Sequence, residues 1–192
     1  NNEWGNHAVM CGSGTQRSAR HDLEIIDILK QLRRRGVISG PLKKFREHDG
    51  GLGATLGRRR RPGDIILFNL GKDGRHILID FTVVNSLSES NIQYISEHGA
   101  GSAADKAEER KRKEYSEYFD SSNILSTQYE FMPFGVETTG ALGKSAKKVL
   151  KLFAKWSSEN STTKKGPLWK ESTATYMATR LNRHLMNHNA AM

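Results

Sequence analysis

Two short apolar runs joined by a polar turn constrain the fold of this chain more than any other feature. The runs cover residues 65–68 and 76–79, and the stretch between them contains Asp73-Gly74. An Asp-Gly pair between apolar runs is a strong β-hairpin signal, because both residues accept the positive φ angles of a tight turn. Asp64 precedes the first run and Asp80 follows the second. An antiparallel hairpin would therefore bring these two carboxylates to the same end of a sheet.

The position of Asp80 indicates a special role for its carboxylate. It follows three apolar residues and precedes Phe81-Thr82, so it lies within a strand that reads as buried. A buried, unpaired carboxylate costs several kcal/mol and is rare. Two neighbouring carboxylates also raise each other's pKa unless a cation neutralises them, and oxygen ligands suit Mg²⁺ or Mn²⁺. For Asp64 a simple turn aspartate after Pro62-Gly63 is the alternative.

The overall charge points to a polyanionic partner. The 192 residues carry a formal net charge of +9, which favours DNA, RNA or an anionic membrane surface. No apolar run approaches the roughly 20 residues of a transmembrane helix, and no signal peptide is visible. The single cysteine, Cys11, excludes an internal disulfide framework and suits a reducing compartment. We expect an intracellular, nuclear protein without a membrane role, and we interpret the initial Asn1 as the start of a fragment of a longer polypeptide.

The pattern along the chain predicts three parts: a polar N-terminal segment (1–17), a main domain (18–158) and a C-terminal helical extension (159–192). The expected elements of the main domain are a helix around 25–32, a short strand within 41–48, a loop at 49–61, hairpin strands at 64–70 and 75–84, an irregular stretch at 86–101, a charged helix at 103–119, a strand at 128–136 and a helix after Gly143. Pro133 makes the strand at 128–136 an edge strand or a bulged one. The order of elements is therefore α-β-β-β-α-β.

Six short motifs follow one another along this framework. They are Gly5-Asn-His7-Ala-Val-Met-Cys11, Arg20-His21-Asp22, Arg61-Pro-Gly-Asp64, Asp80-Phe-Thr-Val83, Lys111-x-x-x-Tyr115 and Pro133-Phe-Gly-Val-Glu137. Together they resemble the PD-(D/E)xK nuclease superfamily, and more narrowly the restriction-like endonuclease domains of non-LTR retrotransposons and related reverse-transcriptase proteins. The resemblance implies an α/β, restriction-endonuclease-like fold with an α-β-β-β-α-β core, a mixed central sheet and extra C-terminal helices.

The resemblance also implies roles for individual residues. Asp64 and Asp80, with the backbone carbonyl of Phe81, would hold one or two Mg²⁺ or Mn²⁺ ions. The superfamily lysine normally lies two residues after the second acid, where this chain has Thr82. The retroelement branch carries that lysine on the following helix, which matches Lys111. Tyr115 would lie on the same helix face.

Other positions carry weaker expectations, each with a plainer alternative. Lys113 is the reserve for Lys111, and a solvated charged helix is the alternative for both. His21 and Asp22 match a helix-one motif of the family, although a histidine on an apolar face is more often a hydrogen-bonded core residue. Glu24 on the same helix is a further candidate metal ligand. Glu137 is another site candidate that could equally cap a neighbouring segment or pair with a basic side chain.

Two further groups of residues suggest binding. His7 and Cys11 resemble the second half of a zinc knuckle, and a structural Zn²⁺ site would need two more ligands upstream, since such sites have four. The run Arg58, Arg59, Arg60 and Arg61 just before Asp64 suits phosphate contacts, with a merely solubilising or nuclear-localisation run as the alternative.

We therefore expect a metal-dependent DNA endonuclease that hydrolyses phosphodiester bonds. The resemblance implies nicking of a target site for retrotransposon integration by target-primed reverse transcription, with DNA and a reverse-transcriptase domain of the same polypeptide as partners. Two alternatives remain: a non-catalytic nucleic-acid-binding module on the same fold, favoured by Thr82, and a structural domain that docks on a reverse-transcriptase core. Metal dependence separates the first from the others, and salt-dependent DNA affinity separates those two.

Overall fold

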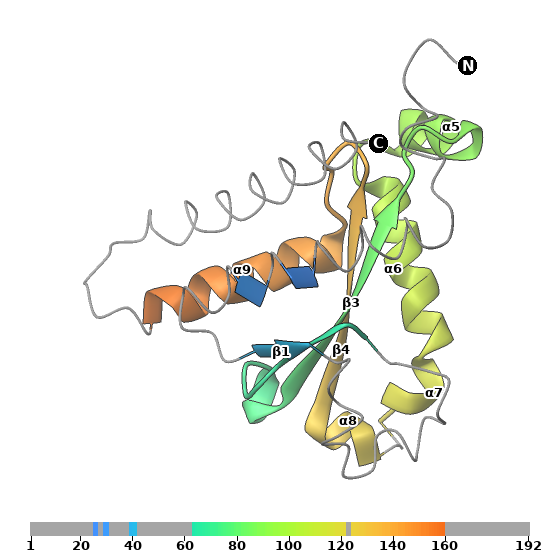
Figure 1. The fold of residues 1–192 in the computed structure, drawn as a ribbon. Helices are drawn as coiled ribbons and strands as arrows, with labels where there is room; N and C mark the ends of the chain where they lie inside the picture. The colour runs from blue at the N-terminus through green and yellow to red at the C-terminus, as the bar shows by residue number, and fades with distance from the viewer. Residues whose placement is uncertain (1–24, 27–28, 31–38, 42–62, 122–123, 160–192) are drawn as a thin grey trace.

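The chain forms a mixed four-stranded sheet with helices on both faces (Figure 1). A computed structural model describes residues 25–26, 29–30, 39–41, 63–121 and 124–159. After helical residues at 25–26 and 29–30, its elements are β1 (Ser39–Pro41), β2 (Ile65–Leu67), a 3-10 turn (Lys72–Gly74), β3 (His76–Val84), α5 (Glu89–His98), α6 (Ser102–Glu114), α7 (Ser116–Phe119), α8 (Ile124–Gln128), β4 (Tyr129–Glu137) and α9 (Lys144–Glu159). The strands lie in the order β1-β2-β3-β4; β3 and β4 are parallel and the other pairs antiparallel.

The predicted hairpin is present as β2 and β3. Ile65 pairs with Ile79, and the connection between the strands contains Asp73 at φ 57° and Gly74 at φ 76°. These are the positive φ angles for which the Asp-Gly pair is suited. The hairpin therefore follows from local sequence.

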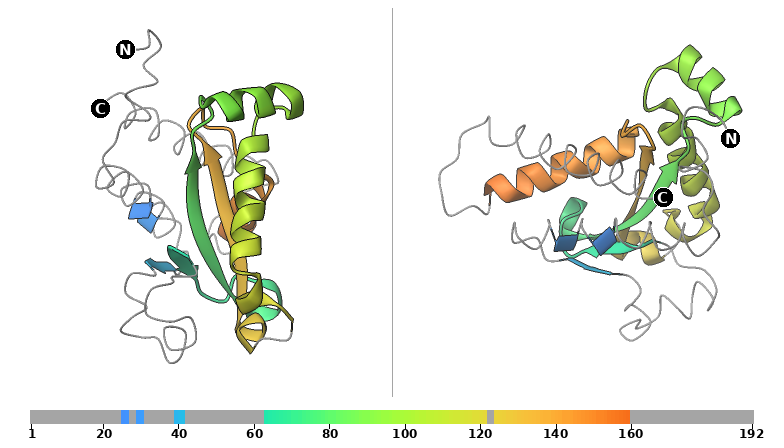
Figure 2. Two further views of the ribbon diagram at one scale, coloured as in Figure 1. Left: turned by 90° about the vertical axis from the view of Figure 1, so that its right-hand side faces the viewer. Right: turned by 45° about the horizontal axis from the view of Figure 1, so that its top comes forward.

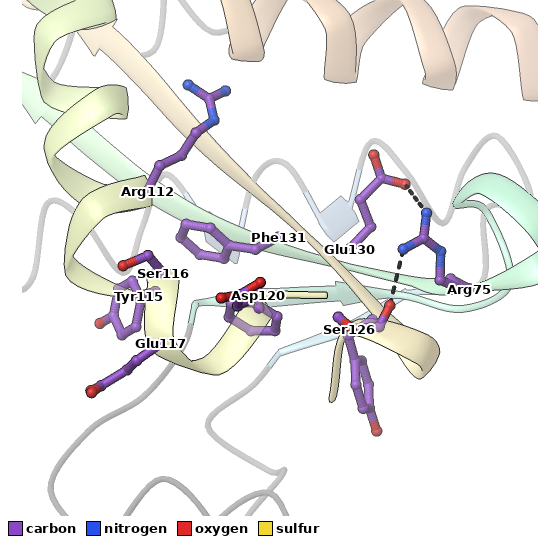
Figure 3. A pocket seen from close by; sticks show the side chains of 11 residues that line it. Arg75, Arg112, Tyr115, Ser116, Glu117, Asp120, Ser126, Glu130 and Phe131 are labelled. Atoms are coloured by element: carbon purple, nitrogen blue, oxygen red, sulfur yellow. Dashed lines mark hydrogen bonds and ion pairs between the residues drawn. The ribbon is translucent and has the colours of Figure 1, made fainter. Parts of the chain in front are cut away.

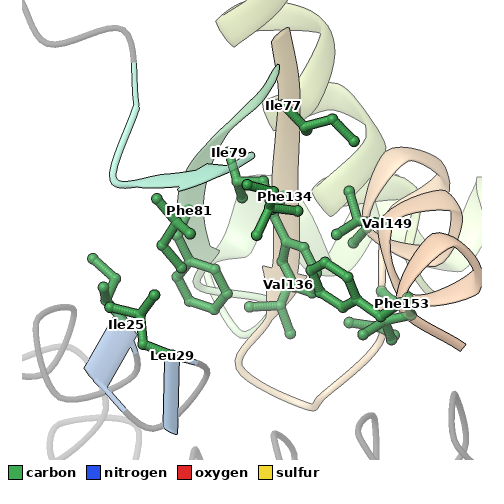
Figure 4. Close-up of a cluster of buried hydrophobic side chains, with 14 residues drawn as sticks. Ile25, Leu29, Ile77, Ile79, Phe81, Phe134, Val136, Val149 and Phe153 are labelled. Carbon is green, nitrogen blue, oxygen red and sulfur yellow. The ribbon is translucent and has the colours of Figure 1, made fainter. Parts of the chain in front are cut away.

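Alternation along the strands sorts their side chains onto the two faces of the sheet. On β3, Ile77, Ile79 and Phe81 join the main core cluster, whereas Leu78 belongs to a second cluster on the other face. The main cluster also takes up α9 and the helical residues 25 and 29; Figure 4 shows these side chains meeting. Its buried members are Ile25, Leu29, Ile65, Leu67, Ile77, Ile79, Phe81, Phe134, Val136, Leu142, Ala146, Val149, Leu150 and Phe153.

Helix α6 covers the opposite face, so that β3 and β4 lie between α6 and α9 (Figures 1 and 2). The approach of α6 to β4 is close at Gly135, where a Cβ atom would come within 2.7 Å of the Ala104 carbonyl oxygen. Only glycine allows the helix to lie at this distance from the strand. Glu137, at the end of β4, accepts hydrogen bonds from the N–H groups of Gly101 and Ala103 and so caps the first turn of α6.

Some expected boundaries were wrong. The stretch 86–101, expected to be irregular, contains α5; its start has Ser88 in extended conformation with Glu89 after it, and its end has Gly99 at φ 86°. These are ordinary helix start and stop signals. The helix expected at 103–119 is broken, because Tyr115 at φ −105° and ψ 9° separates α6 from α7.

The first strand in the described part of the chain is β1, which meets the stretch 41–48 expected to hold a strand only at Pro41; residues 42–48 lie outside the described residues. It pairs with the three residues of β2, and Pro41, which has no N–H, stands at the end of that ladder. The last strand lies at the edge of the described sheet, as Pro133 predicted. Among the described helices, none is long and apolar enough to cross a membrane.

Candidate functional site

Asp64 and Asp80 lie at the same end of the hairpin formed by β2 and β3. Ile65, the first residue of β2, pairs with Ile79, so Asp64 directly precedes and Asp80 directly follows the last pair of this ladder. The Asp64 N–H donates to the Ile79 carbonyl at 2.7 Å, and the Asp64 Oδ2 accepts from the Phe81 N–H at 2.8 Å. Asp80 is 7% exposed, and Asp64 is half-buried. The two carboxylates therefore occupy one end of the hairpin, as the sequence predicted.

Alternation along β3 places Asp80 on the face that α6 covers. Leu78 lies in the buried cluster on this face, and Asp80 lies two residues further along the same strand. Helix α6 packs against β3 and β4 here. A side chain from α6 can thus reach Asp80.

Lys111 of α6 makes that contact. Its Nζ lies 2.9 Å from the Asp80 Oδ2, and the lysine side chain is 22% exposed. The same Nζ stands 5.7 Å from the centre of the Tyr115 ring and 4.0 Å from a carboxylate oxygen of Glu114. Tyr115, which is buried, packs in turn on Phe131 of β4. The helix therefore supplies the cation that Thr82, half-buried on the same strand face as Asp80, does not provide.

A buried carboxylate one turn earlier holds α6 in position. Glu108 is 1% exposed and accepts hydrogen bonds from the N–H groups of Gly135 (3.0 Å), Ser145 (2.8 Å) and Ala146 (2.9 Å). One side chain thus links α6 to β4 and to the first turn of α9. Burial raises the pKa of Glu108 above its usual value, while the three N–H donors and the charge of Arg112 oppose that shift. Glu108 fixes the face of α6 that carries Lys111.

The donor atoms at the carboxylate pair suit a magnesium ion. Two aspartate oxygens are hard ligands, and Mg²⁺ is usually held by one or two carboxylates while keeping several waters. In an extended strand the N–H and C=O of one residue point to the same side, so the Phe81 carbonyl is directed toward the side where Asp64 lies. No group of three His, Cys, Asp or Glu residues suited to a metal occurs in the described part of the chain. The fit therefore depends on two carboxylates and one carbonyl.

Two of the weaker candidates lie away from this centre. Lys113 is exposed, and two residues along a helix turn its side chain about 200° from that of Lys111. Glu137 is 1% exposed, and its carboxylate accepts hydrogen bonds from N–H groups at the start of α6 and from the Thr139 hydroxyl. These contacts match the alternative given above, in which Glu137 caps a neighbouring segment. The capped helix, α6, precedes Glu137 in the chain.

Several predicted residues fall outside the described part of the chain. These are His7, Cys11, His21, Asp22, Glu24, Arg58, Arg59, Arg60 and Arg61, together with the extension beyond residue 159. Their expected roles in zinc binding, catalysis and phosphate contact stay predictions.

The sequence reasoning missed a hollow of about 580 Å³ between α6, α7, α8 and the start of β4 (Figure 3). Tyr115, Phe119, Tyr129 and Phe131 supply aromatic surface. At the side of the hollow, the Arg75 guanidinium donates to the Ser126 carbonyl at 3.0 Å and lies 4.0 Å from the Glu130 carboxylate. The charged lining residues are Arg75, Arg112, Glu117, Asp120 and Glu130. Because carboxylates outnumber guanidinium groups, the hollow does not favour a phosphate.

No match to the chain was found among protein-family models, curated proteins or solved structures.

Proposed function

We propose that the chain is a metal-dependent DNA endonuclease. The observation that carries the proposal is the contact of Lys111 with Asp80, 2.9 Å long, at the end of the hairpin where Asp64 accepts a hydrogen bond from the Phe81 N–H. The hairpin thus supplies two carboxylates and α6 supplies one ammonium group at this end of the sheet. This combination occurs in metal-assisted phosphodiester hydrolysis, where metal-bound carboxylates and a cation act on one phosphate.

Each residue has a role in the proposed reaction, in which water adds across one P–O bond of the DNA backbone. Asp64 and Asp80, with the Phe81 carbonyl, would hold Mg²⁺, which when bound supplies an activated water and stabilises negative charge on the phosphate. Lys111 would orient the attacking water or offset the charge that develops on the phosphate. Tyr115 would help to position the Lys111 ammonium group through the face of its ring, since Nζ lies within the range of a cation–π contact.

The mixed sheet, the order of elements and the lysine on the helix support the narrower proposal of a restriction-endonuclease-like fold of the retroelement type. Under that proposal the enzyme nicks target DNA in the nucleus to prime reverse transcription, as part of a polypeptide with a reverse-transcriptase domain. The net charge of +9 supports DNA as the substrate.

The test is nicking of supercoiled plasmid by the wild-type chain with Mg²⁺, with Mn²⁺ and with a chelator. We expect metal-dependent conversion to open circles, abolished in Asp64→Asn and Asp80→Asn and reduced at least about a hundredfold in Lys111→Gln, since general acid–base and electrostatic groups contribute about 10²–10⁴-fold. Lys113→Gln is the matched control, because it removes the same charge from the same helix on an exposed side.

Two results would contradict the proposal. One is nicking that persists in Asp80→Asn, which would indicate a contaminating nuclease or another centre. The other is a loss in Lys113→Gln equal to that in Lys111→Gln, which would reduce both lysines to a general charge effect. Absence of cleavage with salt-sensitive DNA binding retained in all variants would favour the non-catalytic binding module, for which Thr82 at the usual lysine position is the supporting observation.

A further inference from the structure

The solvent side of α9 carries a row of five exposed lysines, here called the α9 lysine stripe. Its members are Lys144, Lys147, Lys148, Lys151 and Lys155. At 3.6 residues per turn these positions fall within an arc of about 100° around the helix. The opposite side of α9 is buried in the main core through Val149, Leu150 and Phe153. The lysines are thus aligned along one side of a firmly packed helix.

The charges of the stripe are poorly compensated. Its two end lysines meet carboxylates: Lys144 Nζ lies 3.5 Å from Asp105, and Lys155 Nζ lies 3.9 Å from Glu159. In the part of the chain that the structure describes, no ion pair engages the three central members, Lys147, Lys148 and Lys151. Lysines three and four residues apart on one helix repel each other. The centre of the stripe therefore concentrates positive charge.

A helix face that serves only to keep a protein soluble normally mixes the two signs of charge. The exposed side of α6 does so, with Glu109 next to Arg110 and Lys113 next to Glu114. In α9 the only acidic residue is the last one, Glu159. Opposite charges at spacings of three or four residues stabilise a helix, whereas like charges destabilise it by similar amounts. The contrast with α6 indicates that the stripe serves a partner of opposite charge.

We propose that the α9 lysine stripe binds the phosphate backbone of a nucleic-acid strand. From Lys144 to Lys155 the helix rises about 16 Å, since each residue adds about 1.5 Å. That length matches about five nucleotides of one strand at about 3.4 Å each. Lysine contacts phosphate as a point charge and reads no base, so this binding is independent of sequence.

This contact is distinct from the candidate nuclease site. The stripe belongs to the helix on the Phe81 face of the sheet, whereas Asp80 and Lys111 lie on the α6 face (Figure 1). The N–H groups at the start of α9 are engaged by Glu108, so the binding surface is the lysine row and not the helix terminus. The strand on the stripe is therefore a second contact beside any DNA at the carboxylates, and the inference does not depend on the chain being a nuclease.

The experiment compares two triple variants of the full chain, both in an Asp80→Asn background that removes the proposed cleavage. The stripe variant carries Lys147→Gln, Lys148→Gln and Lys151→Gln. The control removes three exposed lysines from separate elements: Lys30→Gln, Lys72→Gln and Lys113→Gln. Glutamine is polar and uncharged and has nearly the helix propensity of lysine, so both variants should fold, and far-UV circular dichroism checks this. Fluorescence anisotropy then measures binding of short single-stranded DNA and RNA at a series of salt concentrations.

We expect the stripe variant to bind either strand about tenfold more weakly or worse at low salt. Its plot of log affinity against log salt should be shallower by about 2, because three phosphate contacts contribute about 0.7 each on a single strand. The control should lose less than about threefold, because its lysines do not share one strand. Equal losses in the two variants would overturn the proposal, since only net charge would then matter. The proposal would also be overturned if polyglutamate displaced the labelled strand as effectively as unlabelled nucleic acid at equal charge. That result would identify an acidic protein as the partner.

Discussion

The buried carboxylate of Glu108 permits a quantitative prediction. Glu108→Ala leaves three buried N–H groups, those of Gly135, Ser145 and Ala146, without the acceptor that lies 2.8–3.0 Å away in the native chain. Each such loss costs about 1–3 kcal/mol. Three such losses would together cost about 3–9 kcal/mol. Water can reach the two amides at the start of α9 once the side chain is gone, so we expect Glu108→Ala to lower the free energy of unfolding by about 3–5 kcal/mol. That is a large fraction of the about 5–15 kcal/mol by which a domain is stable.

Urea denaturation followed by far-UV circular dichroism measures this loss, and thermal unfolding should show a midpoint lower by at least about 6 °C, at about 2–4 °C per kcal/mol for a chain of this size. The matched control is Glu109→Ala, which removes the same group from the next, exposed position of α6 and should change stability by less than about 0.5 kcal/mol. A cost below about 1 kcal/mol for Glu108→Ala would refute the conclusion that this carboxylate fastens α6 to β4 and α9.

The remaining predictions concern the packing of α6 on the sheet and its contact with Asp80. Gly135→Ala should cost about 1–3 kcal/mol of stability and weaken nicking, because its Cβ would lie 2.7 Å from a backbone oxygen. The control Gly74→Ala meets nothing within 4 Å and should cost about 1 kcal/mol for its positive φ alone, so equal melting points of the two variants would contradict this. Because burial raises the folded-state pKa of Glu108 above 4.5, the native chain binds its proton first. Stability relative to Glu108→Gln should thus rise as pH falls through the folded pKa and level off below about 4.5, and a flat difference in urea titrations would exclude this. Lys111→Met should cost about 2 kcal/mol, less than the about 3–5 kcal/mol of a fully buried pair because Lys111 is 22% exposed. Adding Asp80→Asn should recover part of that loss, and additive costs in a double-mutant cycle would show that the pair is not coupled.

Local signals were sufficient to predict the hairpin and the end of it at which the two carboxylates lie. Asp73 and Gly74 have positive φ in the connection, but this connection runs over residues 68–75 and pairs Leu67 with Ile77, so the Asp-Gly pair alone does not fix the register. The contact of Lys111 with Asp80 could not be predicted from local sequence, since no local signal distinguishes Lys111 from its basic neighbours. Only the resemblance singled out this lysine. In the structure Lys111 reaches Asp80 because it lies one turn beyond Glu108, whose contacts fix the orientation of the helix.

Tertiary contacts determined what the sequence reasoning missed. The role of Glu108 depends on N–H groups 27 to 38 residues away, so it is not visible in the helix itself. Glu108 shares the buried face of α6 with the small residues Ala104 and Ala107, and a carboxylate buried on such a face needs hydrogen-bond donors from other segments. Helix α5 was missed because its serines were read as loop residues, although Ser88 and Gly99 are typical of helix ends.

The contacts of Glu108 also impose an order on assembly during synthesis. Asp64, Asp80 and Lys111 all leave the ribosome before Gly135, Ser145 and Ala146, which hold the helix that carries the lysine. A nascent chain that ends before residue 135 therefore contains every residue of the candidate centre but lacks the partners that orient its cation. The candidate centre is completed only when β4 and the first turn of α9 have emerged, so truncated translation products should contain Asp64, Asp80 and Lys111 without the contacts that orient the lysine.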